Sequence, residues 1–130
     1  MTRLWHLAEP DDWLAAQVAG FYERSTRGVS LSEVGFVHCS YPDLLPSVVS
    51  TLYADTVGEF IVLELDRQHL EQAGSPVRDE PGDPKDPASP LFPHVYGPIP
   101  VSAVAGVLHA KVDRGHLTVE SPAETNRRLR

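Results

Sequence analysis

Three histidines, His6, His38 and His94, lie in apolar stretches of this 130-residue chain and are the side chains best suited to chemistry. A neutral imidazole can take up or release a proton near pH 7, hydrogen-bond a ribose or a phosphate, or ligate a metal ion. The separations of 32 and 56 residues match no compact zinc motif, because the ligands of such motifs come in close pairs. The spacing therefore predicts no metal site, although three strands could still bring the histidines together around an ion.

His94 lies in the stiffest segment of the chain, 91–100. Three prolines, Pro93, Pro98 and Pro100, each fix φ at about −65° and remove a backbone donor. Because proline interrupts the hydrogen-bond ladder of a sheet, this segment is predicted to form neither an ordinary helix nor a central strand. Such stiffness either holds the imidazole in a set position for function or forms a packed turn in which the imidazole satisfies a buried carbonyl.

His38 is followed by a cysteine and a serine in a short segment rich in β-formers. Alternation along a strand puts Phe36 and His38 on one face and Cys39 on the other. A thiolate beside an imidazole could act as a nucleophile, but neighbours on a strand point apart, so Cys39 is interpreted as a small buried apolar residue. Ser40 shares the face of His38 and either hydrogen-bonds a ligand or caps the helix that follows.

A charged pair, Arg78 and Glu80, falls on one face of a short predicted strand. The guanidinium of Arg78 could bind a phosphate or carboxylate through two hydrogen bonds, and Glu80 could accept hydrogen bonds from ribose hydroxyls or stabilise a developing cation. The alternative is an exposed ion pair on a charged loop. Tyr22 and Tyr96 are aromatic candidates that either stack on a ligand ring or close the core.

Positioning these side chains requires strands, and the pattern of apolar residues predicts one α+β domain over 1–112 with a curved or split mixed β-sheet and two main helices. The run 60–65 is continuous and rich in β-formers, so it is expected to be a central strand. The proline-rich stretch 81–89 is predicted to be mobile, and residues 113–130 are predicted to form a frayed polar tail. The other strands are predicted at 4–7, 35–40, 77–80 and 104–110, the main helices at 10–19 and 42–54, a turn or short helix at 66–70 and a helical turn at 100–104.

The composition excludes several classes of function. A formal net charge of −7 argues against a nonspecific nucleic-acid binder, which needs a basic face, but leaves room for a small basic pocket. The single cysteine excludes an intramolecular disulfide and fits a reducing compartment. No apolar run approaches the roughly 20 residues of a membrane span, and the N-terminus lacks a signal-peptide core, so a cytoplasmic location is expected. Dinucleotide-fold, P-loop and zincin motifs do not occur, and the oligomeric state stays open.

Several segments, in order along the chain, resemble the bacterial domain-of-unknown-function family nine-fifty-two, whose members are sometimes mislabelled as glutathione S-transferase domain proteins. The pair of motifs G-F-V-H-C-S at 35–40 and F-P-H-V-Y at 92–96 is the specific part of this resemblance. The other matching pieces, which extend the resemblance over about residues 3–110, are L-W-H-L at 4–7, residues 12–20, V-L-E-L-D at 62–66 and V-R-D-E at 77–80.

The family is in turn similar in pattern to the ADP-ribosyltransferase superfamily, which implies a split β-sheet that grips an extended dinucleotide. The implied reaction is cleavage of an N-glycosidic bond through an oxocarbenium-like state. This chain departs from the family pattern at Asp79, where an aromatic residue is common, and in the loop 81–90, which is longer and richer in proline. The implied pocket consists of His6 as a ligand of ADP-ribose, His38 and Ser40 along the cleft, and His94, Tyr96 and Glu80 completing it.

We therefore expect a small enzyme that binds an NAD-like or ribosyl nucleotide and cleaves or transfers at its N-glycosidic bond. NAD would be a substrate, and no firm cofactor is implied. A non-catalytic binding module for a small anionic metabolite and a histidine-based, metal-dependent hydrolase are the alternatives. The expected catalytic residues are His38, Glu80 and His94, and the expected ligand-binding residues are His6, Ser40, Arg78, Tyr96 and Tyr22.

Overall fold

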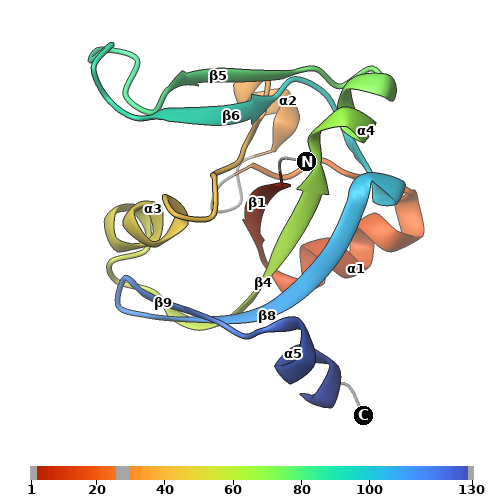
Figure 1. The fold of residues 1–130 in the computed structure, drawn as a ribbon, viewed down its shortest axis with the longest axis vertical. Coiled ribbons are helices and arrows are strands. Elements are labelled where there is room, and N and C mark those ends of the chain that lie inside the picture. The colour runs from red at the N-terminus through yellow and green to blue at the C-terminus, as the bar shows by residue number, and fades with distance from the viewer. Residues whose placement is uncertain (1–2, 26–29, 129–130) are drawn as a thin grey trace.

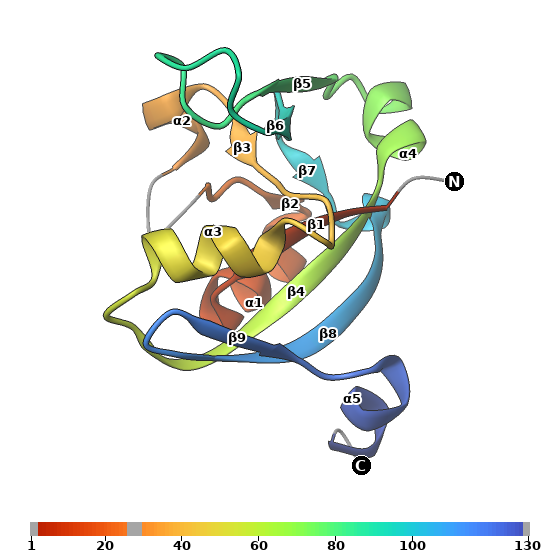
Figure 2. The same ribbon diagram turned by 60° about the vertical axis from the view of Figure 1, so that its left-hand side comes forward.

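A four-stranded antiparallel sheet forms the base of the computed structural model, which describes residues 3–25 and 30–128 (Figure 1). Its order is β1-β4-β8-β9, so β4 pairs with a neighbour on each side, as predicted for the run 60–65. The long strands β4 and β8 curve beneath the rest of the molecule (Figure 2). The bounds are β1 Arg3–Ala8, β4 Val57–Asp66, β8 Val104–Asp113 and β9 His116–Val119.

A three-stranded sheet and a two-stranded ribbon lie on the other side of the molecule from β8 and β9 (Figure 2). The three-stranded sheet has the order β3-β6-β5, and the ribbon pairs β2 with β7. A single bridge between Trp5 and Ser40 ties β1 to the chain just after β3. The bounds are β2 Phe21–Tyr22, β3 Val37–His38, β5 Val77–Pro81, β6 Leu91–Val95 and β7 Ile99–Pro100.

The α+β class and the curved sheet are confirmed, whereas the predicted mixed sheet is wrong. Every strand pair in the described part of the chain is antiparallel. A parallel pair needs a crossover that returns to the same sheet. Here the two longest helices join strands of different sheets, since α1 (Pro10–Ala19) connects β1 to β2 and α3 (Leu45–Leu52) connects β3 to β4.

These two helices correspond to the two predicted main helices. Helix α1 ends at Gly20, whose φ of +93° is readily adopted only by glycine. Helix α3 begins later than predicted because Tyr41 to Leu44 form a turn, in which Leu44 N–H donates to Tyr41 O at 2.9 Å. Ser40 therefore does not cap this helix. No helix in the described ranges is long and apolar enough to cross a membrane. The shorter helices are α2 Leu31–Val34, α4 Arg67–Gln72, α5 Pro122–Arg128 and the 3₁₀ turn Val101–Ala103.

Apolar side chains pack on both faces of the base sheet. Leu63 and Leu65 of β4 enter one cluster with α1 and the three-stranded sheet. Phe60 and Val62 enter a second cluster with α3 and β9. All four side chains are buried. Covering of both faces explains why this strand is continuously apolar instead of alternating.

The prediction that the segment 91–100 contains no central strand is wrong, because β6 is the middle strand of its sheet and contains Pro93. Cys39 N–H donates to Pro93 O at 3.0 Å, and the N and O of one residue in an antiparallel strand face the same neighbour. The missing donor of Pro93 therefore faces β3 at the point where β3 ends and the chain turns to β1. Proline is tolerated here because the ladder stops at this residue.

The prediction of a frayed tail from residue 113 is also wrong for the described residues. Strand β9 pairs with β8, and Leu117 and Val119 pack on the cluster beneath α3. Thr125 of α5 is buried, and its hydroxyl oxygen accepts a hydrogen bond from His109 N–H at 3.0 Å. The apolar and polar alternation at 116–119 covers only four residues, so pairing with β8 decides that this stretch is a strand.

Candidate functional site

Adjacent strands of the three-stranded sheet bring three of the predicted site residues into one hydrogen-bonded chain. His38 of β3 lies opposite His94 of β6, and His38 Nδ1 is 3.2 Å from His94 Nε2. From β5, on the other side of β6, Glu80 Oε1 accepts a hydrogen bond from His94 Nδ1 at 2.9 Å. We call these three side chains, Glu80, His94 and His38, the relay.

The hydrogen bonds of the relay determine which ring nitrogens carry hydrogens. A carboxylate only accepts, so His94 Nδ1 carries a hydrogen and, in the neutral ring, His94 Nε2 is an acceptor. His38 Nδ1 is then the donor between the two rings, and His38 Nε2 keeps a lone pair. Within the described part of the chain that nitrogen is buried and has no hydrogen-bond partner. The relay thus ends on a buried nitrogen that has a free lone pair.

Aromatic side chains hold the carboxylate end of the relay. Tyr96 donates a hydrogen bond to Glu80 Oε1, and the guanidinium carbon of Arg78 lies 5.2 Å from the centre of the Tyr96 ring. Phe36 stacks on the His94 ring, with 4.1 Å between centroids. Hydrogen bonds from Tyr96 and His94 hold the pKa of Glu80 below its ordinary value, so Glu80 is ionised at neutral pH. These contacts orient the His94 ring from two sides.

Burial controls the charge of His38. Removal from water, and then repulsion by His94 and His6, lowers the pKa of His38 to about 4. The ring is accordingly neutral at neutral pH, in agreement with the hydrogen-bond pattern of the relay.

His6 supports His38 from behind. Its Nδ1 donates to the backbone oxygen of His38 at 2.8 Å, and its Nε2 accepts from the Tyr22 hydroxyl at 3.0 Å. Burial lowers the pKa of His6 to about 4, although the bond to His38 O raises it. Burial also raises the pKa of Tyr22. Because both ring nitrogens of His6 are satisfied inside the protein, the geometry gives His6 and Tyr22 a positioning role.

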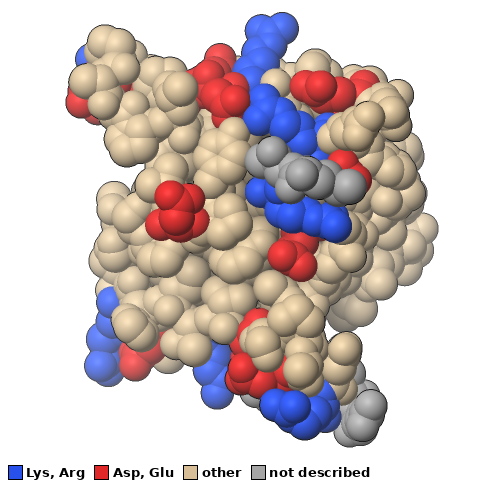
Figure 3. Space-filling view, viewed as in Figure 1, with Lys and Arg blue, Asp and Glu red and all other residues tan. Residues whose placement is uncertain are grey.

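His38 lines an open cavity of about 290 Å³ between α3 and the loop that joins β5 to β6, which we call the His38 cavity. The surface is hollowed between these two segments at the left of Figure 3, where its walls are mostly uncharged. The Phe92 ring also lines the cavity, 5.2 Å from the His38 ring. A Cβ at position 82 would lie 2.6 Å from the Phe92 ring, so a larger residue than Gly82 would displace that ring.

Hydrogen bonds link the two sides of the loop 81–90, which forms one wall of this cavity. The sequence predicts that the stretch 81–89 is mobile. Gly82 N–H donates to Pro90 O at 3.0 Å, and Asp83 N–H donates to Ser89 Oγ at 3.2 Å. These bonds close the base of the hairpin next to β5 and β6. Movement of the loop over a ligand stays a prediction.

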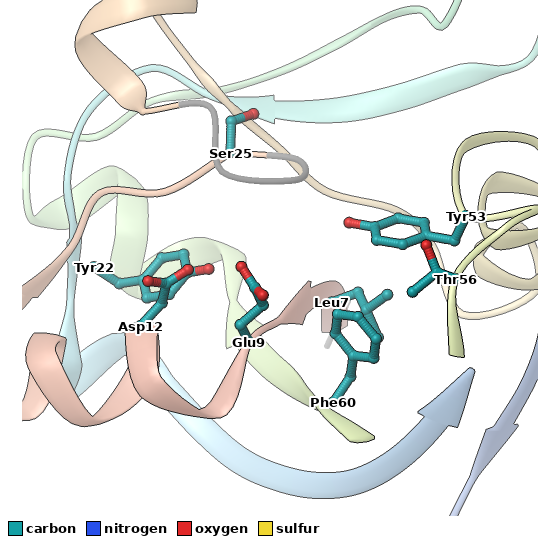
Figure 4. Close-up of a pocket in the computed structure, with 8 residues that line it drawn as sticks. All are labelled: Leu7, Glu9, Asp12, Tyr22, Ser25, Tyr53, Thr56 and Phe60. Atoms are coloured by element: carbon teal, nitrogen blue, oxygen red, sulfur yellow. The ribbon is translucent and has the colours of Figure 1, made fainter. Parts of the chain in front are cut away.

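A second cavity, of about 230 Å³, lies beside Tyr22. Figure 4 shows the carboxylates of Glu9 and Asp12 near the Tyr22 hydroxyl, with Tyr53 on the opposite wall. The Tyr22 hydroxyl donates to His6, so hydrogen bonds connect this cavity to the backbone of His38. No Lys or Arg is among the described residues that line it.

The remaining predicted residues lie outside the His38 cavity. Ser40 is 1% exposed and shares with His38 a groove of about 10 Å³, roughly the space of one water molecule. Arg78 lies against Tyr96 and does not line the cavity. Cys39 is buried, and burial raises the pKa of its thiol, which agrees with the prediction that it faces away from His38.

Asp79 ties β5 to α4. Its carboxylate accepts hydrogen bonds from the Tyr41 hydroxyl and from Arg67, whose Nη2 lies 3.1 Å from Asp79 Oδ2. Burial raises the pKa of Asp79, but these hydrogen bonds outweigh it and hold the pKa below its usual value. These contacts support the strand that carries Glu80.

Sequence reasoning missed the polar wall that α3 contributes to the His38 cavity. Ser47 and Thr51 lie four residues apart on this helix, and both line the cavity. Their helical spacing is the signal that could have found them. Nothing in the local sequence indicates that this face of the helix lies across from Asp83 and Phe92.

No group of three or more His, Cys, Asp or Glu side chains among the residues that the structure describes is arranged to hold a metal ion. His38 and His94 bond to each other, and His6 bonds to Tyr22 and to the backbone. These bonds occupy ring nitrogens that a three-histidine metal site would need.

The fold is similar to that of the protein CC0527 from Caulobacter crescentus. Its X-ray structure matches with a TM-score of 0.70 at 20% identity and covers 90% of this chain and 94% of that chain. Its solution NMR structure matches with a TM-score of 0.65 at 19% identity, over 98% of this chain and 97% of that chain. Identity at this level shows the fold alone, and no curated protein sequence matches the chain. A family model described as "Protein of unknown function (DUF952)" matches residues 7–107, and the chain therefore belongs to that family.

Proposed function

We propose that this protein is a small enzyme that binds a ribosyl compound in the His38 cavity and cleaves or transfers at its N-glycosidic bond. The observation that carries the proposal is the relay, because it ends on a buried ring nitrogen with a free lone pair in a residue that lines a cavity. A carboxylate that orients one histidine against a second base is an arrangement suited to moving a proton. The similarity of the sequence pattern to ADP-ribosyltransferases supplies the choice of bond.

In the proposed step, a water molecule or an acceptor hydroxyl gives its proton to His38 Nε2. The hydrogen on His38 Nδ1 passes to His94 Nε2, and the Glu80 carboxylate stabilises the imidazolium that results. The oxygen bonds to C1′ of the ribose while the C1′–N bond breaks, and the electron pair of that bond leaves with the base. For NAD and water, the products are ADP-ribose, nicotinamide and the proton left on the relay.

This proposal changes the role expected of Glu80. The resemblance implies a glutamate beside the developing cation, but the Glu80 carboxylate bonds to His94 and Tyr96, and Glu80 does not line the His38 cavity. We therefore assign Glu80 the role of orienting the His94 ring and stabilising its protonated form. Tyr96 and Arg78 act on the carboxylate end of the relay and not on the ribosyl compound.

Incubation of the purified protein with NAD, with nicotinamide release followed by chromatography, tests the proposal. We expect saturable release by the native protein and a loss of about 100-fold or more in His38→Gln, because glutamine cannot take up a proton. His116→Gln is the matched control, since His116 is exposed on β9 of the base sheet. It should release nicotinamide at the native rate.

Two outcomes would contradict the proposal. Equal release by the native protein and His38→Gln would remove the relay from the reaction. Stabilisation of the native protein against heat by NAD, without any release, would favour the alternative of a non-catalytic binding module.

A further inference from the structure

We infer that the His38 cavity holds only the nucleoside part of its ligand, a part that is neutral or cationic and rich in hydrogen-bond donors, and that any phosphate group stays outside the cavity. This inference rests on the proposed function and names the part of the ribosyl compound that the cavity holds. Three features of the cavity lead to it: its charge, its hydrogen-bonding groups and its size.

The charge of the cavity opposes a phosphate group. Among the described residues that line it, none is Lys or Arg, and Asp83 is the single charged side chain. Protein sites bind phosphates through Arg, Lys or converging backbone N–H groups. The N–H of Asp83 already donates to Ser89 Oγ, and the N–H of Gly82 to Pro90 O. A phosphate in this cavity would therefore meet a carboxylate without a compensating cation.

The polar groups of the cavity are mainly acceptors. The Ser47 hydroxyl donates to Leu44 O at 2.8 Å, and the Thr51 hydroxyl donates to Ser47 O at 3.0 Å, so both hydroxyl oxygens are left as acceptors. The Asp83 carboxylate accepts only, and His38 Nε2 carries a lone pair. Ribose hydroxyls can donate to the two hydroxyl oxygens and to the carboxylate, whereas an ionised phosphate oxygen cannot.

The size and the apolar wall fit a single nucleoside. A volume of about 290 Å³ lies at the lower end of the range for small-molecule pockets, so it cannot enclose a whole dinucleotide. Phe92, Val48 and Pro90 supply an apolar wall against which a base can pack. The ribose of such a nucleoside would meet Ser47, Thr51 and His38.

Binding of a matched pair of uncleavable ligands tests the inference separately from catalysis. Pseudouridine is a C-glycoside, so it has no N-glycosidic bond to break, and its 5′-phosphate differs only in charge and size. By calorimetry with the full chain, pseudouridine should bind at least about tenfold more tightly than its 5′-phosphate, because phosphate gains no charged partner.

A charge reversal sharpens the test. In Asp83→Lys, pseudouridine 5′-phosphate should bind at least as tightly as pseudouridine, because the substitution places a cation where the structure has a carboxylate. Asp113→Lys makes the same charge change at an exposed residue at the end of β8, and should keep the native preference. A similar shift in both variants would mean that net charge, and not the cavity, sets the preference.

Tighter binding of the phosphate to the native protein, or no saturable binding of either ligand, would overturn the inference. These outcomes are distinguishable from a failure of the proposed function, which nicotinamide release measures. Nucleoside binding without release of nicotinamide from either NAD or nicotinamide riboside, a phosphate-free nucleoside with the same C1′–N bond, would leave the inference standing and remove the catalytic proposal. Release of nicotinamide from NAD, together with tighter binding of pseudouridine 5′-phosphate than of pseudouridine, would support the catalytic proposal and overturn the inference.

Discussion

At the scale of single residues, the proposed reaction depends on how Glu80 helps His38 to act as a base. Burial lowers the pKa of His38 to about 4, and an isolated ring with that value is a weak base at neutral pH. In the proposed reaction, a proton taken up by His38 does not stay there, because the hydrogen on His38 Nδ1 moves to His94. The positive charge then lies against the Glu80 carboxylate, 2.9 Å from His94 Nδ1. The carboxylate therefore offsets the cost of placing charge in a buried site.

Replacement of Glu80 by glutamine tests this role. Glutamine keeps an oxygen that can accept from His94 and Tyr96 but lacks the charge, so we expect kcat for nicotinamide release to fall by about 100-fold with KM little changed. Glu59→Gln is the matched control, since Glu59 lies 3.2 Å from His109 in a second carboxylate–histidine pair, and neither residue lines the cavity. Equal activity in the two variants would show that the Glu80 charge does not act in the reaction.

At the scale of elements, α5 is attached to the base sheet through the backbone of β8. His109 N–H donates to the Thr125 hydroxyl at 3.0 Å, and His109 O accepts from Glu120 N–H at 2.9 Å. Thr125 is 5% exposed, and its hydroxyl takes the place of a strand partner for the half-buried His109 N–H. This contact makes α5 part of the folded domain.

Thr125→Val removes that acceptor while keeping the volume of the side chain. A typical hydrogen bond contributes about 0.5–1.5 kcal/mol, so we expect a loss of about 1 kcal/mol in the free energy of unfolding measured with urea. Thr118→Val makes the same chemical change at an exposed position of β9 and should stay within about 0.5 kcal/mol of the native protein. An unchanged stability in Thr125→Val would mean that α5 is not held by this bond.

At the scale of the whole molecule, two buried neutral histidines make stability depend on pH. Burial lowers the pKa of both His6 and His38 from 6.5 to about 4. Between these values the unfolded chain binds protons that the folded chain does not, so the free energy of unfolding rises with pH in this interval. The stability that the two neutral histidines contribute is therefore lost as the pH falls from about 6.5 toward 4.

We therefore expect the free energy of unfolding to decrease between pH 6.5 and pH 4.5, by up to about 1.4 kcal/mol per pH unit for each of the two histidines. Urea denaturation at a series of pH values measures the slope. His6→Gln keeps groups able to bond to Tyr22 and to the His38 backbone but does not titrate, so its slope should be smaller. A free energy that stays level or increases toward pH 4.5 would show that neither histidine is held neutral by the fold.

The local sequence by itself determined those features of the fold that depend on residues close together in the chain. Gly20 ends α1, the run 60–65 forms the central strand, and strand alternation separates His38 from Cys39. Motif order along the chain was also sufficient to recognise the DUF952 family. These properties depend on neighbouring residues, on chain order and on burial of apolar side chains, which a sequence displays directly.

The tertiary structure alone decided the site, because its contacts join residues that are distant in sequence. His38 meets His94 through pairing of β3 with β6, and that pairing also accommodates Pro93 in a middle strand. Strand register sets which side chains are adjacent, and a proline is tolerated only where the ladder ends. The same pairing bonds Glu80 to His94 and leaves one nitrogen of His38 without a partner, which no single segment of the sequence could indicate.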